Sequence, residues 1–140
     1  MDVKNRVKWR QSLIVVSATV ALMFVVLAVS KGDPPKSVTP VEAKALLQSD
    51  SSMVILDVRT EGEYKSETGH LGNAILIPVQ EIEKRIGELA PFKERTILVY
   101  CRTGHRSTIA AGILQEHGFD VRNMDGGITQ WLKENFPVVK

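Results

Sequence analysis

The 140 residues are enough for one compact domain of about 100 residues and a short appendage. The net charge of +2 is unevenly spread, since residues 1–36 carry six Lys/Arg against two Asp, while residues 37–140 are net acidic. The basic excess therefore belongs to the N-terminal tail, which argues against a nucleic-acid partner, and one cysteine with three scattered histidines predicts no metal site and no cofactor.

The N-terminal part is predicted to be a membrane anchor. Residues 1–12 are basic, and the 17 residues from Leu13 to Val29 carry no charge, which as a helix would span roughly 25 Å. We expect a transmembrane helix at 13–30, with the N-terminus in the cytoplasm and the domain on the outer, periplasmic or extracytoplasmic side. The alternative is a signal peptide cleaved near Ala28-Val29-Ser30, which would release a secreted domain. Residues 31–36, which contain two prolines, are predicted to be a stiff linker.

Residues 37–140 are predicted to form one α/β domain. Thr39 to Glu42 resembles a capping box with proline at the first helical position, so a helix is expected through about Gln48. Short apolar runs, typical of strands buried on both faces, lie at 53–57, 74–77 and 96–100, and a fourth strand is predicted at 119–123. Further helices are predicted at 61–66, 80–89 and 107–117 and around Trp131 and Leu132.

This alternation of short apolar strands and helices indicates a mostly parallel sheet flanked by helices. In such folds ligands bind beyond the carboxyl ends of the strands. Cys101 directly follows the predicted strand at 96–100, so we expect it at that end of the sheet.

The loop from Cys101 to Ser107 is the strongest candidate for a reactive site. Backbone N–H groups before a helix have no helical partner, and together with the helix dipole they favour an anion at the centre of the loop. A thiolate there would be stabilised, Arg102 and Arg106 would lower the pKa of Cys101 further, and Gly104 would let the loop curl tightly. The alternative for a lone cysteine is a small buried apolar residue, which does not explain two arginines and a glycine beside it.

Several motifs, in chain order, resemble the rhodanese family and cover about residues 38–136. They are Asp57-Val58-Arg59, Glu63-Tyr64, Gly69-His70-Leu71, the strand ending at Pro78, Tyr100 to Ser107, and Gly126-Gly127-Ile128 with Trp131. The resemblance implies a rhodanese fold and sulfur transfer through a persulfide on Cys101. It also implies that Arg102, Thr103, Gly104, His105, Arg106 and Ser107 form the substrate-binding loop. By the same resemblance Asp57 and Arg59 support that loop, while Glu63, His70 and Trp131 are interpreted as packing or hydrogen-bonding residues.

Loop length separates the chemistries known for this fold. Cysteine phosphatases and arsenate reductases of related fold use a C-x5-R loop, whereas Cys101 to Arg106 has the shorter C-x4-R spacing of the sulfur-transferring members. Tyr100 also stands where the phosphatases usually have histidine. The resemblance thus favours a transferase over a phosphatase.

The expected function is a two-step transfer of a sulfane sulfur from a small anionic donor, thiosulfate or a persulfide, to cyanide, a thiol or a protein acceptor. The acceptor must come from outside, because the chain has no second cysteine. Alternatives are a non-enzymatic persulfide carrier that delivers sulfur to a partner, a phosphatase or arsenate reductase, and an interaction domain.

Overall fold

The computed structural model describes residues 33–140. The predicted basic segment at 1–12 and transmembrane segment at 13–30 lie outside this part of the chain. Among residues 33–140, every helix is too short or too polar to cross a membrane.

A five-stranded sheet forms the centre of the domain, with the strand order β1-β5-β4-β2-β3, and all its pairings are parallel. The strands are β1 (Lys36–Val38), β2 (Val54–Asp57), β3 (Ile75–Leu76), β4 (Ile97–Tyr100) and β5 (Val121–Met124). The α-helices are α2 (Pro40–Ser49), α3 (Glu61–Tyr64), α4 (Ile82–Arg85), α5 (His105–Glu116) and α6 (Gly127–Lys133), and short 3₁₀ helices lie at Val79–Glu81 (η1) and Ile86–Phe92 (η2). The predicted α/β class with a parallel sheet flanked by helices is confirmed.

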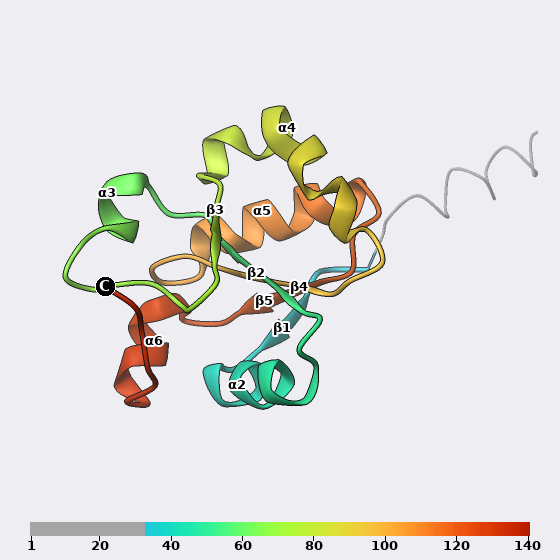
Figure 1. Cartoon of the computed structure of the whole chain (residues 1–140). Coiled ribbons are helices and arrows are strands. Elements are labelled where there is room, and N and C mark those ends of the chain that lie inside the picture. The colour runs from blue at the N-terminus through green and yellow to red at the C-terminus, as the bar shows by residue number, and fades with distance from the viewer. Residues whose placement is uncertain (1–32) are drawn as a thin grey trace, which may run out of the picture. The chain divides into compact units, whose positions relative to one another are not determined.

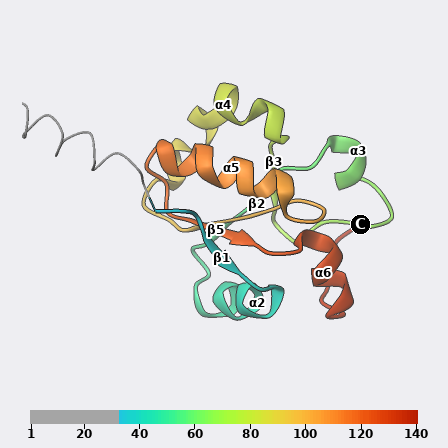
Figure 2. The same cartoon turned by 180° about the vertical axis from the view of Figure 1, so that it is seen from behind.

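Helices cover both faces of the sheet. Figures 1 and 2 show α4 and α5 on one face and α2 and α6 on the other. Each face has its own buried apolar cluster: Ala110, Ala111 and Leu114 of α5 pack on one side, and Ile128 and Trp131 of α6 on the other. Because side chains alternate along a strand, β4 supplies both clusters, and all four of its residues are buried.

The central position of β4 decides where the site lies. β4 pairs with β2 on one side and with β5 on the other, so its carboxyl end is fixed from both sides. Cys101 is the next residue, and the loop that it begins leads into α5. The loop lies between α3 and α6 in both views (Figures 1 and 2).

Local sequence signals explain several element boundaries. The predicted capping box at the start of α2 is present, with Thr39 and Glu42 each bonding the backbone of the other. The predicted helix at 80–89 is instead broken into η1, α4 and η2, and Gly87 and Pro91 both lie in the stretch that fails to continue as an α-helix. The buried residues Ile82 and Leu89 still reach the core, so the apolar spacing predicted burial correctly but not the backbone form.

Candidate active site

The Cys101 side chain lies at the bottom of its loop and is only 1% exposed. The N–H of Gly104 donates a hydrogen bond to Sγ over 3.1 Å, which turns the loop around the sulfur. Gly104 has a φ of 109°, in the region that favours glycine, and it caps α5. α5 therefore begins at His105, two residues earlier than predicted, so His105, Arg106 and Ser107 lie in its first turn.

Hydrogen bonds make the sulfur a good site for negative charge. Burial raises the pKa of the Cys101 thiol, but hydrogen bonds from the Ser107 hydroxyl and from backbone N–H groups outweigh it. Those N–H groups belong to Ser107, Gly104 and Thr103, and the net result is a pKa below the ordinary value. The thiolate is thus favoured chiefly by the loop's own amides and hydroxyl rather than by the arginines.

The Gly104 carbonyl fixes the other side of the loop. It accepts hydrogen bonds from Ser107 Oγ at 3.0 Å, Thr108 Oγ1 at 2.9 Å and Thr108 N at 3.1 Å. Thr108 Oγ1 in turn accepts from Nδ2 of the buried Asn123 in β5. The Ser107 hydroxyl has a single proton, so it donates either to this carbonyl or to the sulfur, and the two Thr108 donors keep the carbonyl bonded when the hydroxyl turns to the sulfur.

The first turn of α6 holds the cysteine loop from behind. The N–H of Ile128 donates to the Cys101 carbonyl at 2.9 Å, and the N–H of Thr129 donates to the Arg102 carbonyl at 3.1 Å. A Cβ on Gly127 would lie 2.4 Å from the Cys101 oxygen and 2.6 Å from the Arg102 oxygen, so only glycine fits. With these carbonyls bound to α6, the N–H groups of the loop are left to face the sulfur.

Asp57 and Arg59 form a buried ion pair at the end of β2. Arg59 is 1% exposed and Asp57 is fully buried, and Arg59 Nη2 lies 2.7 Å from Asp57 Oδ2. The Tyr100 hydroxyl donates to the same carboxylate oxygen at 2.7 Å and accepts from the N–H of Leu71. Burial and the Asp57 charge together raise the pKa of Tyr100, which stays a neutral donor. Because Tyr100 directly precedes Cys101, this network ties the end of β4 to that of β2.

Arg106 is bound to another side chain. Its two terminal nitrogens each lie 2.7 Å from one carboxylate oxygen of Glu63, in a two-bond pair between α5 and α3. Glu63 also caps α3 through its reciprocal bonds with Thr60. The Arg106 guanidinium, more than the other contacts, lowers the pKa of Glu63 to about 2.

The remaining residues of the predicted loop are open to solvent. Arg102, Thr103 and His105 are all exposed. Within residues 33–140, Arg102 makes no ion pair with another side chain. It is therefore the cation of the loop that remains available to a ligand.

Sequence reasoning missed three contributions to this arrangement. The Tyr100 hydroxyl, the pairing of Glu63 with Arg106 and the contact of Gly127 with the loop all join residues far apart in the chain. The pattern Thr60-x-x-Glu63 signals a capping box, which accounts for Glu63 locally and gives no hint of a second partner.

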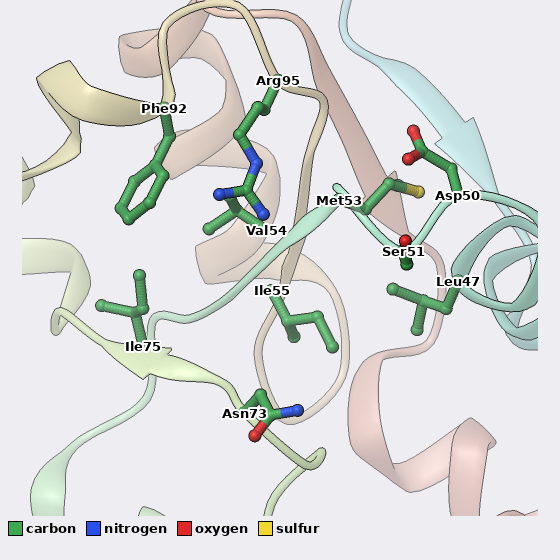
Figure 3. A pocket seen from close by; sticks show the side chains of 10 residues that line it. All are labelled: Leu47, Asp50, Ser51, Met53, Val54, Ile55, Asn73, Ile75, Phe92 and Arg95. Atoms are coloured by element: carbon green, nitrogen blue, oxygen red, sulfur yellow. The ribbon is translucent and has the colours of Figure 1, made fainter.

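A pocket of about 490 Å³ lies away from this site (Figure 3). It is at the amino end of the sheet, where Arg95 and Phe92 face Leu47 and Ser51 across the opening. Its other lining residues are Asp50, Met53, Val54, Ile55, Asn73 and Ile75. None of them belongs to the cysteine loop, so the pocket is separate from the sulfur.

The chain is similar to proteins of one family. Residues 39–134 match the family model for the Rhodanese-like domain. A sulfurtransferase of Allochromatium vinosum is 33% identical over 94 residues, which cover 66% of this chain and 84% of that protein. Thiosulfate sulfurtransferase PspE of Escherichia coli is 38% identical over 73 residues, which cover 52% of this chain and 68% of that protein.

A solved structure has the same fold. The rhodanese-related protein from Thermoplasma volcanium aligns with a TM-score of 0.66 at 28% identity, over 74% of this chain and 97% of that one. Some relatives are longer: the chain spans 46% of the putative sulfur carrier protein YrkF of Bacillus subtilis, with 39% identity over 89 residues. It spans 26% of the probable adenylyltransferase/sulfurtransferase MoeZ of Mycobacterium tuberculosis, with 33% identity over 102 residues.

Proposed function

Because the chain belongs to the rhodanese-like domain family, we propose that it is a sulfurtransferase that carries a sulfane sulfur as a persulfide on Cys101. The observation that carries the proposal is the environment of Sγ. The sulfur is buried and accepts a hydrogen bond from the Gly104 N–H. Hydrogen bonds within the loop lower the pKa of the Cys101 thiol. A loop of this kind stabilises both a thiolate and the anionic outer sulfur of a persulfide.

The reaction runs in two displacements. In the first, the Cys101 thiolate forms an S–S bond to the outer sulfur of the donor, and the donor's bond to that sulfur breaks. The electron pair leaves on the remainder of the donor, which is sulfite if the donor is thiosulfate. In the second, an acceptor nucleophile bonds to the outer sulfur of the persulfide, and the electron pair returns to Cys101 as a thiolate.

We propose thiosulfate or an organic persulfide as donor, and cyanide, a small thiol or a protein thiol as acceptor. The acceptor comes from another molecule, because Cys101 is the only cysteine in the chain. Arg102, exposed and free of ion pairs within residues 33–140, is suited to orient an anionic donor. The names of two relatives, a sulfurtransferase and a thiosulfate sulfurtransferase, support this class of reaction.

A persulfide carrier is the second candidate. It would use the same Cys101 chemistry but deliver its sulfur to one partner protein instead of turning over small substrates. The relative named putative sulfur carrier protein YrkF supports this second candidate. YrkF is longer than the segment of it that matches this chain. A phosphatase or arsenate reductase is disfavoured, because the loop has one residue fewer than the C-x5-R loop and Arg106 is bound to Glu63.

We further propose that residues 13–30 anchor the chain in a membrane, with the domain on the outer side. The support is the uncharged run after four cations in residues 1–12. Protease added to spheroplasts, from which any outer membrane has been removed, should digest the domain. Protection of the domain in spheroplasts, but not in lysed cells, would overturn the outward orientation.

Formation of thiocyanate from thiosulfate and cyanide tests the proposed transfer, with Cys101→Ser as the matched variant. We expect turnover by the full chain and none by the variant, with both chains equally folded. Equal turnover would exclude Cys101 as the carrier. Hydrolysis of an aryl phosphate that disappears in Cys101→Ser would instead support a phosphatase.

A further inference from the structure

The charge of Arg106 is neutralised by Glu63. Both terminal nitrogens of the guanidinium bind the carboxylate, each over 2.7 Å, and the two side chains are only 27% and 29% exposed. The carboxylate is held in turn, since Glu63 Oε2 also accepts from the N–H and the hydroxyl of Thr60 at 3.1 Å. Bonds on both sides thus fix the pair in one orientation between α3 and α5.

The pair leaves the cysteine loop with one unneutralised cation. Glu63 stays ionised at neutral pH because its pKa is about 2, so it and Arg106 together contribute no net charge. Arg102 remains as a positive side chain without an ion pair among residues 33–140. It is exposed and available to a ligand, whereas any further negative charge brought by the ligand would meet only backbone N–H groups.

Arg106 is nevertheless close enough to respond to the sulfur. Its bonds to Glu63 are the main reason that the pKa of Arg106 is raised, and the negative charge of Cys101 adds to the effect. If Glu63 did not hold it, the guanidinium would be a second cation for a ligand at the loop. Its present partner therefore determines how much negative charge the loop accepts.

We propose that Glu63 is a specificity-determining residue that, by holding Arg106, makes the loop prefer organic persulfides over doubly charged oxyanions. The inference rests on the proposed function and narrows its donor class. An organic persulfide, R–S–SH or R–S–S⁻, brings at most one negative charge to the thiolate. Thiosulfate, phosphate and arsenate bring up to two, which one free arginine does not balance.

The favoured first step is balanced without any further reactant. The Cys101 thiolate bonds to the outer sulfur of R–S–SH, the S–S bond of the donor breaks, and the electron pair leaves as R–S⁻. The proton stays on the transferred sulfur, which is now the outer atom of Cys101–S–SH. With thiosulfate the leaving group is sulfite, so two negative charges must leave a loop that has one free cation.

Glu63→Gln separates the charge of this residue from its capping role. Glutamine serves at the same position of a capping box, so α3 keeps its cap while Arg106 loses its ion pair. Glu61→Gln is the matched control, because it removes one negative charge from the same helix at an exposed residue paired with Lys65. The double variant Glu63→Gln/Arg106→Gln tests whether the released guanidinium causes the effect.

The first readout does not need sulfur transfer. The full chain is alkylated at Cys101 with iodoacetamide in the presence of increasing inorganic phosphate, and the phosphate concentration that halves the rate is measured. We expect Glu63→Gln to lower that concentration about fivefold, which corresponds to about 1 kcal/mol. Glu61→Gln should need the same phosphate concentration as the wild type, and the double variant should need more phosphate than Glu63→Gln does.

The second readout compares donors. In Glu63→Gln the KM for thiosulfate should fall by a similar factor, while kcat/KM for a small organic persulfide should change less than twofold. If Glu63→Gln and Glu61→Gln give the same phosphate protection and the same KM, the inference is overturned. If the wild type transfers sulfur from neither donor, the proposed function fails instead, whatever the phosphate result.

Discussion

The backbone of Gly127 lies directly against the carbonyl oxygen of Cys101. A Cβ at this position would be 2.4 Å from that oxygen, and the φ of Gly127 is 56°. The next N–H, from Ile128, donates to the same oxygen. The loop that holds the sulfur is therefore shaped by a segment about 26 residues later in the chain.

Gly127→Ala should displace the cysteine loop. The methyl group would meet backbone atoms that cannot move without breaking the bonds between α6 and the loop, and the left-handed φ adds strain. We expect a loss of about 2 kcal/mol or more in the free energy of unfolding and a large fall in Cys101 alkylation at neutral pH. Urea unfolding and the alkylation rate measure the two effects.

Gly112→Ala is the control for this substitution. Gly112 lies within α5, where a Cβ would have nothing within 4 Å, so alanine should stabilise the helix by about 0.5–1 kcal/mol. Equal behaviour of the two variants would contradict the close contact at Gly127.

Asp57→Asn should be the most destabilising change at a charged residue of the domain. It would leave the Arg59 guanidinium buried without its counter-charge, which costs about 3–5 kcal/mol. Glu61→Gln, which breaks an exposed pair that solvent screens, should leave the free energy of unfolding almost unchanged. Urea unfolding of both variants measures the two changes in the free energy of unfolding. Similar losses would mean that the buried pair stabilises the fold no more than the exposed pair does.

The sequence predicted the order and class of most elements because the signals were local. The apolar run at 96–100 and the capping box at Thr39 needed no tertiary information, and both appear in the structure. β1 was missed, since three residues that contain Lys36 and Ser37 carry no strand signal and form a strand only by pairing with β5.

The contacts that support the cysteine loop were less predictable from the sequence than the residues at its centre. Cys101 and Gly104 are recognisable because they sit within one short loop after an apolar strand. Glu63 reaches Arg106 across 43 positions of sequence, and Tyr100 reaches Asp57 across the same number. Such pairs depend on how α3 and β2 pack against the loop, and a single sequence contains no signal for that packing.

Cys101 should react as a thiolate at a lower pH than an ordinary cysteine. Its pKa is lowered by hydrogen bonds, among which the Ser107 hydroxyl contributes most, so the midpoint of its alkylation profile should lie at a lower pH than that of a free cysteine. Ser107→Ala should move the midpoint of the pH profile upward. An unchanged midpoint would show that the backbone N–H groups suffice, and Ser49→Ala, at an exposed serine of α2, serves as the control.

The stability contributed by Glu63 should depend on acid pH. A carboxyl group whose folded pKa is lowered stabilises the protein above its unfolded pKa, near 4.5, and this contribution is lost as the pH falls through about 2. The difference in unfolding free energy between wild type and Glu63→Gln should be constant above about pH 5 and shrink below it. Urea titrations between pH 2 and 6 measure it, and a difference that stays flat over this range would contradict the lowered pKa.

The intact mass of the full chain after exposure to a sulfur donor tests the central claim most directly. We expect the wild type to gain one sulfur atom from an organic persulfide or from thiosulfate and to lose it when cyanide is added, while Cys101→Ser gains none. A folded wild type that gains no sulfur from either donor, or a Cys101→Ser variant that gains the same mass, would contradict a persulfide on Cys101.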